Sequence, residues 1–418
     1  MKRSYSIVLL ILVIFFVISF LTNILGALNP SVSLSFDLSE TMAGFLPFAF
    51  FIAYGVMSIP AGFMVEQYGE KKMILFAFVL AFAASVLFAG LPSFGVFVFS
   101  LFTIGTGMAI LQVVINPLLR VTGGEEHYAF TSVMAQLVFG AASFVSPQVY
   151  SWLVVGLDSP ATEHSGIIEI LSGIVPPEMT WVSMYWIFAL FSLAMILIIF
   201  VVRFPKVELN EDEKVGSKEN YLILFKNKLV ILYFFGIFAY VGVEQGISYW
   251  MSKFLQIYHG LDFETVGAKA VGNFWGLMTI GGILGLILLK VMDSKLVLKL
   301  FTSIAIISLA VALFSSSADI SLYAFQTSGF FLSVMYPIIL SLALNSVSKH
   351  HGSFAGILMT GIMGGAVVQL LIGFISDFTS LKVGMFFNFV ALAYILSIGF
   401  WAKPIISNKT ISLKKKQE

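Results

Sequence analysis

Stretches of twenty or more mostly apolar residues, separated by short polar breaks, fill the chain from Ile7 to Trp401. Each is long enough to cross the hydrocarbon core of a bilayer as an α-helix. The stretch from Met73 to Leu91 carries apolar residues on every face, whereas a barrel strand would alternate polar and apolar positions over about ten residues. The pattern predicts an all-α membrane protein with twelve transmembrane helices.

The first apolar stretch follows Lys2 and Arg3, as a signal peptide would. It is long and is not followed by a cleavage motif of small residues, so we interpret it as the first membrane helix. The predicted spans are residues 7–28, 41–64, 72–91, 95–120, 128–153, 181–202, 228–257, 264–290, 294–315, 319–346, 353–376 and 383–402.

Composition supports the membrane assignment and excludes several kinds of site. Hydrophobic residues make up 59% of the chain and charged residues 11%, whereas about a quarter of the residues of a soluble domain are charged. The chain has no cysteine, which excludes disulfides and thiolate metal sites. Its five histidines fall mostly in the breaks between spans, so neither a metal site nor a cofactor is expected.

The charges are unevenly distributed although the net charge is only +1. If Met1 faces the cytoplasm and each span crosses once, all 23 Lys and Arg residues except Lys253, Lys269 and Lys382 lie on the cytoplasmic side. This distribution obeys the positive-inside rule. It predicts a multi-pass protein of the inner (plasma) membrane with both termini in the cytoplasm.

The longest charged break divides the spans into two groups of six. We expect an N-terminal bundle (1–202), a cytoplasmic linker (203–227) and a C-terminal bundle with a short tail (228–418). A weak internal repeat supports two pseudo-symmetric six-helix bundles. A glycine-bearing helix end followed by an acid and a lysine comes after span two and again after span eight. Parallel repeats of this kind hold substrate near mid-membrane between the halves.

The break after span two has the pattern G-x-x-x-[DE]-x-x-G-x-[KR]-[KR], in Gly62, Glu66, Gly69, Lys71 and Lys72. It resembles the loop of the major facilitator superfamily. Glycine lets two helices approach closely, and an acid near cations can form charge pairs that break and re-form as the halves rock. The pattern predicts a conformational gate. A loop that only sets topology would account for the lysines but not for the spacing of glycine and acid.

Four further segments resemble the fucose:proton symporter family of that superfamily, which includes bacterial glucose/galactose transporters. They occur in the family's order over nearly the whole chain, and they are "LQVVINP" (Leu111 to Pro117), "YVGVEQGISYW" (Tyr240 to Trp250), "YPIILSLAL" (Tyr336 to Leu344) and "MTGIMGGAVVQLLIGFISD" (Met359 to Asp377). The resemblance implies the twelve-helix fold of two six-helix bundles and the transport of a sugar.

The chain departs from this family at positions tied to proton coupling and sugar recognition. Fucose-transporting members carry an aspartate on span one and a glutamate in the span-four motif, where this chain has Gly26 and Gln112. A glutamine at the second position is familiar from glucose/galactose-type members. On span five, "AFTSVMAQL" (Ala129 to Leu137) replaces the family's R-L-N-L-x-Q-x-x-N stretch. If cations are coupled, the usual pair of acids does not couple them.

Glu244 and Lys269 are the two ionisable residues that the predicted spans place well inside the membrane. An ionised side chain at mid-helix costs at least about 2.5 kcal/mol. Glu244 lies between Gly242 and Gly246, where missing side chains leave room for a substrate or a neighbouring helix. We expect it to couple transport by binding H⁺ or Na⁺, because burial favours the protonated form of a carboxylate. The alternative is a structural ion pair, for example with Lys269.

Sugar hydroxyls need groups that donate and accept hydrogen bonds without adding charge, such as amides, and aromatic faces complete such pockets. Each of these residues could instead join helices together or anchor the chain at the interface. The predicted substrate-binding residues are Gln112, Asn116, Gln136, Tyr240, Gln245, Trp250, Asn273, Tyr336 and Gln369, with Gln326 and Trp275 as further candidates.

Local signals mark irregular segments. Asn23 and Asn29, beside Gly26 and Pro30, are typical of a broken helix in span one, although they could simply end it. The segment from Pro30 to Glu40 is expected to be an external loop in which Ser39 caps span two. The external loop 158–180 is expected to contain a short amphipathic helix at 167–174.

We therefore expect a secondary transporter that takes up a monosaccharide such as a hexose, coupled to H⁺ or Na⁺, by alternating access. The expected partners are the sugar, the cation and the lipid bilayer, without nucleic acid, and the protein is expected to be a monomer. No phosphate-binding loop G-x-x-x-x-G-K-[ST] occurs and no nucleophile–base set suggests an enzyme. Three alternatives remain: a uniporter or exporter of another small solute, a non-transporting membrane sensor built on a transporter scaffold, and, less favoured, a membrane enzyme.

Overall fold

The structure is a computed structural model that describes residues 5–124, 128–164, 166–204, 218–347 and 351–405, and these residues are nearly all helical. It contains twelve helices that are long and apolar enough to cross a membrane, which confirms the predicted number of spans. These helices cover Tyr5–Ser35, Glu40–Tyr68, Glu70–Gly90, Phe94–Gly123, Phe130–Asp158, Pro177–Val201, Lys228–His259, Phe263–Val291, Ser294–Phe314, Ala318–Leu344, Gly352–Phe378 and Leu381–Trp401. The predicted boundaries shift by a few residues, except at the end of span one.

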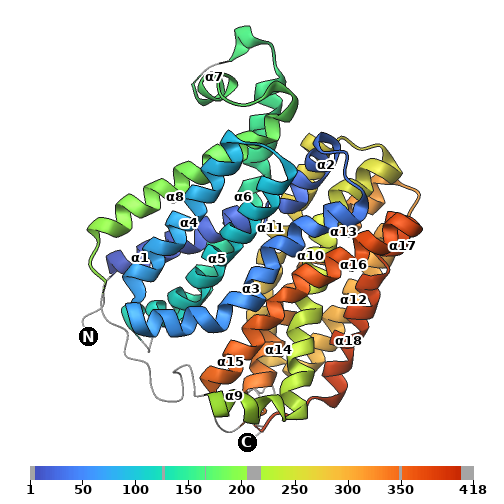
Figure 1. The fold of residues 1–418 in the computed structure, drawn as a ribbon. Helices are drawn as coiled ribbons and strands as arrows, with labels where there is room; N and C mark the ends of the chain where they lie inside the picture. The colour runs from blue at the N-terminus through green and yellow to red at the C-terminus, as the bar shows by residue number, and fades with distance from the viewer. Residues whose placement is uncertain (1–4, 125–127, 165, 205–217, 348–350, 406–418) are drawn as a thin grey trace, which may run out of the picture.

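The helices form two bundles (Figure 1). The first bundle contains α1 (Tyr5–Thr22), α2 (Leu25–Ser35), α3 (Glu40–Tyr68), α4 (Glu70–Gly90), α5 (Phe94–Gly123), α6 (Tyr128–Asp158), α7 (Ile167–Ser172) and α8 (Ser183–Val201). After α9 (Lys218–Phe225), the second bundle contains α10 (Lys228–His259), α11 (Ala268–Val291), α12 (Ser294–Phe314), α13 (Ala318–Leu332), α14 (Met335–Leu344), α15 (His351–Thr360), α16 (Gly364–Phe378), α17 (Leu381–Gly384) and α18 (Phe387–Trp401). Short turns of other helix types are η2 (Ala161–Glu163), η3 (Pro177–Val182), η5 (Phe263–Gly267) and η6 (Gly361–Met363).

The outward faces of α8, α12 and α18 are apolar. Large side chains there remain exposed, such as Phe200 at 73%, Ile307 at 60% and Phe400 at 69%. Contiguous exposed apolar surface is rare on a soluble monomer and marks a membrane-facing or interaction surface. Together with the length and hydropathy of the spans, it is the surface expected of a bundle surrounded by lipid.

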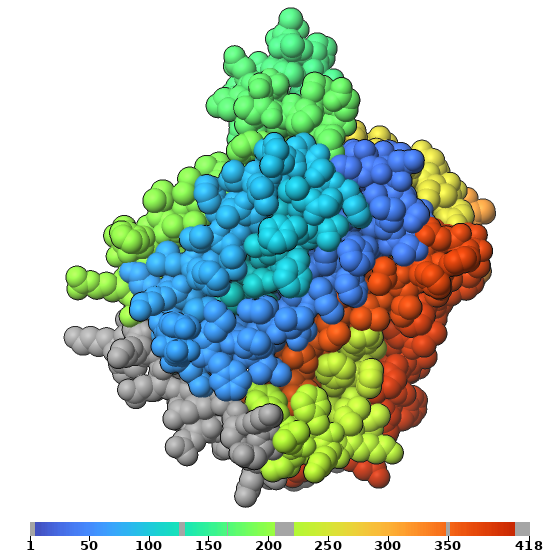
Figure 2. Space-filling view, in the orientation of Figure 1, coloured from blue at the N-terminus to red at the C-terminus, as the bar shows by residue number. Residues whose placement is uncertain are grey.

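The start of α1 and the end of α18 lie at one end of the molecule, which we name the terminal end; the opposite end, where α2, α7 and α17 lie, is the distal end (Figure 1). The bundles meet along α3 and α16, along α6 and α11, and where α2 crosses α10. In Figure 2 the blue surface of α3 lies directly against the red surface of α16. The bundles converge at the distal end and diverge toward the termini (Figure 1).

Span one is broken, as Asn23 and Gly26 predicted. α1 ends at Thr22, α2 begins at Leu25, and Asn23 in the turn donates to the Ser143 hydroxyl of α6 at 2.8 Å. The break is buried, so it does not expose carbonyl groups to water. Buried polar groups at the break therefore tie span one to α6, because lipid supplies no partner for them.

The prediction that the external loop starts at Pro30 is wrong, since α2 continues through this proline to Ser35. Pro30 removes a single backbone donor in the middle of a helix that is enclosed by neighbours, and a membrane bundle tolerates this. The predicted cap is confirmed, because the Ser39 side chain accepts from the Met42 amide at 3.3 Å. The short helix expected in the loop 158–180 is also present, as α7.

The internal repeat between the two halves corresponds to equivalent hydrogen bonds from a lysine to the end of the sixth helix in each bundle. Lys71, at the start of α4, donates to the carbonyls of Phe200 and Val202 at the end of α8, at 2.9 and 2.7 Å. Lys295, at the start of α12, donates to the Ala402 carbonyl at the end of α18, at 3.4 Å. In each bundle a lysine on the third span thus satisfies carbonyl groups that the sixth helix leaves unpaired at its C-terminus. The predicted linker 203–227 falls largely on residues that the structure does not describe, so these domain boundaries stay a prediction.

A glycine is required between α3 and α4. Gly69 ends one helix and begins the next with a φ of +82°, which L side chains rarely adopt, and an added Cβ would meet no atom within 4 Å. We expect Gly69→Ala to lower the free energy of unfolding by about 1–2 kcal/mol through backbone strain alone. Thermal unfolding in detergent measures this. The matched control is Gly90→Ala in α4, where the space is equally open but φ is not positive; equal stabilities of the two variants would contradict the assignment.

Candidate functional site

Glu244 lies near the middle of α10 in a small polar cluster. The Tyr240 hydroxyl, one turn earlier, donates to its carboxylate at 2.7 Å, and the Gln245 side chain also hydrogen-bonds to it. The rings of Tyr240 and Tyr336 lie 5.7 Å apart, so α14 closes one side of the cluster. Glu244 and Tyr336 are half-buried, whereas Tyr240 and Gln245 are buried. The structure thus brings four of the predicted site residues together.

The space beside Glu244 left by two glycines is occupied by neighbouring helices of the same bundle. An added Cβ at Gly242 would lie 3.2 Å from the Cβ of Val368 on α16, and one at Gly246 would lie 3.0 Å from the Cγ of Asn388 on α18. The glycines therefore let α16 and α18 pack closely on one face of α10, and this room is not available to a substrate.

The prediction that Lys269 lies well inside the membrane is wrong. It is the second residue of α11 and is exposed, because the π-turn η5 before it lies at the distal end. The buried lysine is instead Lys253, 8% exposed, near the distal end of α10. Among the described residues, Glu244 has no ion-pair partner, and its hydrogen bonds come from neutral groups.

The other predicted amides fall into three groups. Asn273 on α11 donates to Gln326 on α13 at 3.4 Å, so these two form a pair within the second bundle. Asn116 on α5 donates to the backbone carbonyl of Gln112, one turn earlier, at 3.2 Å, and both are half-buried. Gln136 on α6 is exposed.

Two predicted site residues are fully enclosed. Gln369 on α16 is 0% exposed and donates to the Gly242 carbonyl of α10 at 3.1 Å, which joins these helices. Trp250 is also 0% exposed and lies edge-on against Tyr249 with ring centres 5.0 Å apart. These contacts give both residues a packing role in this conformation.

An ion pair joins the two bundles at the distal end. The Lys253 ammonium on α10 lies 2.7 Å from the Glu40 carboxylate at the start of α3 and donates to the Ser33 hydroxyl of α2 at 3.2 Å. Asn29 of α2 extends this network, because it accepts from Ser33 at 3.1 Å and donates to the Tyr249 carbonyl of α10 at 3.1 Å. Every link but one crosses between the bundles.

Two further bonds cross at the same end. The Asp377 carboxylate at the end of α16 accepts from the backbone amides of Glu40 and Thr41, at 2.7 and 3.0 Å. An acid of one bundle thus caps the first turn of a helix of the other, where unpaired amides and the helix dipole favour a negative charge. The Tyr249 hydroxyl donates to the Ala43 carbonyl at 2.6 Å. The distal end is therefore closed by charged and neutral contacts together.

The predicted gate motif lies at the terminal end of α3 and the start of α4. Gly62 is buried, Glu66 and Lys72 are exposed, and Lys71 bonds to the end of α8 in its own bundle. Glu66 comes near the linker helix α9: burial and this carboxylate raise the pKa of Tyr221, and a hydrogen bond with Ser353 of α15 opposes the rise. The acid of the motif thus faces the second bundle while Lys71 stays with the first.

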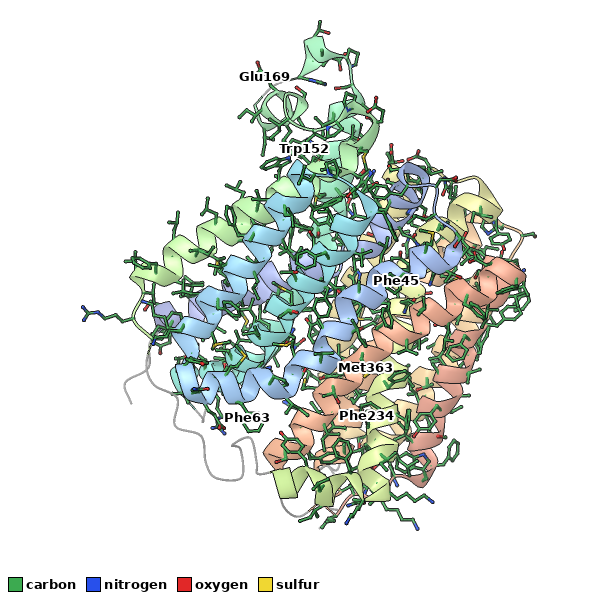
Figure 3. All side chains as sticks on the ribbon, in the orientation of Figure 1. Phe45, Phe63, Trp152, Glu169, Phe234 and Met363 are labelled. Carbon is green, nitrogen blue, oxygen red and sulfur yellow. The ribbon has the colours of Figure 1, made fainter. Side chains whose placement is uncertain are left out.

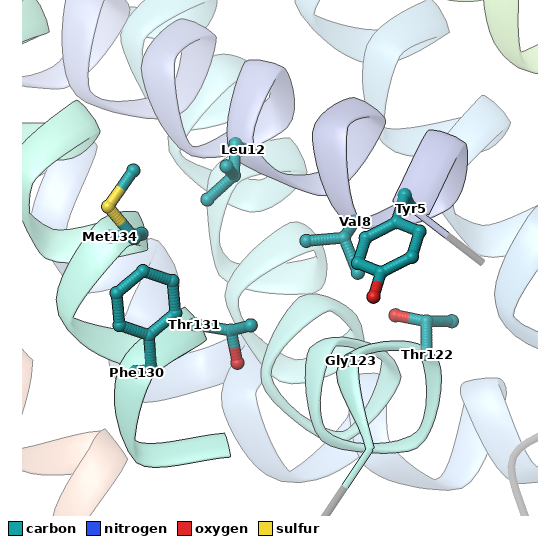
Figure 4. A pocket seen from close by; sticks show the side chains of 8 residues that line it. All are labelled: Tyr5, Val8, Leu12, Thr122, Gly123, Phe130, Thr131 and Met134. Atoms are coloured by element: carbon teal, nitrogen blue, oxygen red, sulfur yellow. The ribbon is translucent and has the colours of Figure 1, made fainter. Parts of the chain in front are cut away.

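A cavity of about 590 Å³ lies at the terminal end of the first bundle, between α1, α5 and α6. Figure 4 shows the hydroxyl groups of Tyr5 and Thr122 on one side and Phe130 and Met134 on the other. Its walls are mostly apolar, and none of the predicted site residues lines it. It therefore adds no polar contact to the cluster around Glu244.

Sequence reasoning missed the residues that close the distal end. The charge distribution only excludes Lys253 from the cytoplasmic side; its position inside the predicted seventh span was the available signal. Glu40 and Asp377 stand at helix ends, where acids are common, so nothing local shows that they face the other bundle. Gln148 of α6 was also missed; its amide nitrogen would lie 2.8 Å from a Cβ added at Gly272 of α11.

Comparison with known proteins identifies the family. The family model described as Major Facilitator Superfamily matches residues 10–370. The chain belongs to the Major Facilitator Superfamily. The structure agrees, with a TM-score of 0.67 to the superfamily transporter FucP in the outward conformation, at 22% identity over 95% of this chain and 98% of that one. A bacterial homologue of the human lysosomal transporter Spinster, inward-facing and unoccupied, gives 0.76 at 15% identity over 96% and 97% of the two chains.

Two superfamily relatives are similar over most of their length. The glucose/galactose transporter of Brucella abortus is 28% identical over 404 residues, which cover 95% of this chain and 94% of the relative. The L-fucose-proton symporter of Escherichia coli is 27% identical over 410 residues, covering 90% and 88%. These relatives and the structural neighbours are transporters and not enzymes, as the sequence predicted.

The ion pair predicts how the distal end responds to charge changes. Lys253→Met or Glu40→Gln leaves the charge of the other residue uncompensated. Breaking a fully buried pair in this way destabilises the paired state by about 3–5 kcal/mol. A smaller effect is expected here because the Glu40 side chain is 22% exposed. We expect each single variant to shift the distal end toward opening by about tenfold, which corresponds to 1.4 kcal/mol.

Spin labels measure this opening. The chain has no cysteine, and Leu34 on α2 and Ile257 on α10 are exposed at 65% and 51% on opposite bundles, so cysteines there carry a label pair across the distal end. The double variant with Glu40→Lys and Lys253→Glu keeps the attraction and is the control, expected to restore the short distance. Unchanged distances in both single variants would show that the pair does not hold this end.

Proposed function

We propose that this protein is a secondary transporter that takes up a hexose together with H⁺ or Na⁺, and that Glu244 carries the coupling. The glucose/galactose transporter and the L-fucose-proton symporter among its relatives support a sugar as cargo and a cation as its companion. Membership of the superfamily supports alternating access between the two bundles.

The environment of Glu244 is the observation that carries the proposal. Its carboxylate lies mid-span, and its hydrogen bonds come from the neutral Tyr240 and Gln245. Lys253, further along the same helix, is paired with Glu40. An ionised carboxylate in low-dielectric surroundings needs a compensating charge or a proton. A cation that binds and leaves during transport supplies this compensation, and the structural ion pair with Lys269 offered as the alternative is not made.

The polar side chains around this acid suit a sugar. Tyr240, Gln245 and Tyr336 lie around Glu244. The Asn273–Gln326 pair of α11 and α13, in the same bundle, is a further proposed source of amide contacts. Amides and phenols donate and accept hydrogen bonds, which matches a ring of hydroxyls, and the two tyrosine rings offer apolar faces. From the first bundle, the half-buried Gln112 and Asn116 on α5 and the exposed Gln136 on α6 are the proposed contacts.

The positive-inside distribution supports uptake across the inner membrane with both termini in the cytoplasm. In that orientation the distal end is external, and this conformation, closed there, is one that would release cargo inward. The gate residues Gly62, Glu66, Gly69, Lys71 and Lys72 then lie on the cytoplasmic side. A monomer suffices, because both bundles come from one chain.

Binding is the first test of the cargo. Ligands that bind the folded protein raise its melting temperature by mass action, by about 2.7 kcal/mol of stabilisation at a hundred times the dissociation constant. We expect D-glucose or D-galactose to raise the melting temperature, and a cation-dependent step to appear in a pH or Na⁺ series. A screen in which no hexose shifts the transition, while another solute does, would favour the uniporter or exporter of a different cargo.

Replacing the acid separates coupling from exchange. In proteoliposomes, Glu244→Gln should lose accumulation of labelled hexose driven by a pH or Na⁺ gradient, because the amide carries no charge to compensate, while counterflow exchange continues. The matched control is Glu169→Gln on the exposed helix α7 (Figure 3), which should behave as wild type. Full accumulation by the Glu244 variant would overturn the coupling role, and the absence of flux of any solute in the wild type would favour the sensor.

A further inference from the structure

The contact between span one and α10 is confined to the distal end. The second half of the span, α2, crosses α10 there, whereas its first half, α1, packs on α5 and α6 of its own bundle. The bundles' other contacts run further along the molecule: α3 touches α16, η6 and α15 in turn. One such contact joins Met363 of η6, labelled in Figure 3, to the middle of α3: its sulfur would lie 3.1 Å from a Cβ added at Gly55. Distal opening must therefore break the α2–α10 crossing together with the distal part of the α3–α16 contact, where Asp377 caps α3.

Gly26 lies at the centre of this crossing. A Cβ added there would overlap the carbonyl oxygen of Ser248, lie 2.8 Å from its carbonyl carbon and lie 3.1 Å from the Cα of Tyr249. All three atoms belong to the backbone of α10, so no side-chain rotation relieves the overlap. The neighbouring bond from Asn29 to the Tyr249 carbonyl, at 3.1 Å, fixes the register of the two helices at this point.

We infer that Gly26 is a steric determinant of the closed distal end: α2 and α10 can cross there only because position 26 has no side chain, as Gly44 and Gly373 allow the close contact of α3 and α16 at the same end. The polar network of Lys253, Glu40, Ser33 and Asn29 forms across the same surface and needs the same close approach. A residue with a Cβ at position 26 separates α2 from α10 and stretches these bonds together.

A consequence for coupling follows, and it rests on the function proposed above. A carboxylate at position 26 and the closed distal end exclude each other, because even the first carbon of an aspartate side chain does not fit. A transporter with this closed state needs its titratable group elsewhere, and Glu244 on α10 is one helix turn before Ser248 along the same helix. The missing side chain at Gly26 allows the distal end to close, and Glu244 supplies the titratable group that position 26 has no room for.

Alanine substitution tests the inference because it adds a single carbon. With spin labels at Leu34→Cys and Ile257→Cys, we expect Gly26→Ala to lose most of the short distal distance and populate a longer one. The purified variant should keep a cooperative thermal transition, because the overlap exists only when the bundles meet. Gly26→Ser, which adds a small polar side chain to the same carbon, should give the same long distance.

Two control glycines distinguish a closure defect from a folding defect. Gly282→Ala in α11 meets no atom within 4 Å and should leave the distances and the melting temperature unchanged. Gly105→Ala in α5 would overlap the Phe50 carbonyl of α3 inside the first bundle, so it should lower the melting temperature without a specific change at the distal end. If Gly26→Ala keeps the wild-type distance, the inference fails; if it lowers the melting temperature as Gly105→Ala does, the contact is structural and the inference also fails.

The readout does not depend on the cargo. Distances between labels report closure whether the solute is a hexose or another molecule, and whether or not Glu244 binds a cation. Failure of hexose uptake together with a longer distance in Gly26→Ala would leave the steric role intact. Uptake that depends on Glu244 with an unchanged distance in Gly26→Ala would remove the steric role and leave the coupling.

Discussion

A solvent that offers no hydrogen bonds is the constraint on which this structure depends. Every backbone polar group inside the spans must find its partner within the molecule. The backbone meets this requirement by forming helices, and side chains at the irregular points meet it by bonds such as the one from Asn23 to Ser143 at the break in span one. Even helix ends follow the rule, since Lys71 and Lys295 bond to the last carbonyls of α8 and α18.

The same constraint applies to two ionisable residues of α10, the buried Lys253 and the half-buried Glu244. Lys253 forms an ion pair with Glu40 of the other bundle, so its charge is compensated only while the distal end is closed. Glu244 forms its hydrogen bonds with neutral side chains, so among the described residues no cationic side chain compensates the negative charge of its carboxylate. Lys253 thus ties charge compensation to conformation, and in the proposed function Glu244 ties it to a bound cation. Two charges on one helix would in this way connect cargo binding with movement of the bundles.

The sequence predicted the features that local patterns determine. The twelve spans follow from apolar length, the break in span one from Asn23 and Gly26, and the cap at Ser39 from a preference that acts over three residues. The prediction at Pro30 is wrong because the local preference against proline inside a helix does not decide the structure where neighbouring helices enclose the segment. The resemblance to a transporter family also led to the superfamily that the comparisons identify.

Contacts between the bundles could not be predicted in this way. Lys253 and Glu40 are separated by more than two hundred residues, and their pairing depends on how the bundles are docked. The same holds for Trp250 and Gln369, which a pattern of polar and aromatic residues marks as pocket-forming but which the packing encloses. The family resemblance implies that Gly26 stands where fucose-transporting members carry an aspartate; only the crossing of α2 and α10 shows that a side chain would not fit here.

The most direct test of the central claim is to record cation movement while sugar is added. Proteoliposomes that contain the purified protein, with a pH-sensitive or Na⁺-sensitive dye inside and no imposed gradient, are given D-glucose or D-galactose from outside. The account predicts that the sugar drives H⁺ or Na⁺ inward in the wild type and that Glu244→Gln removes this signal. Sugar entry without cation movement in the wild type, or an equal signal in the variant, would contradict it.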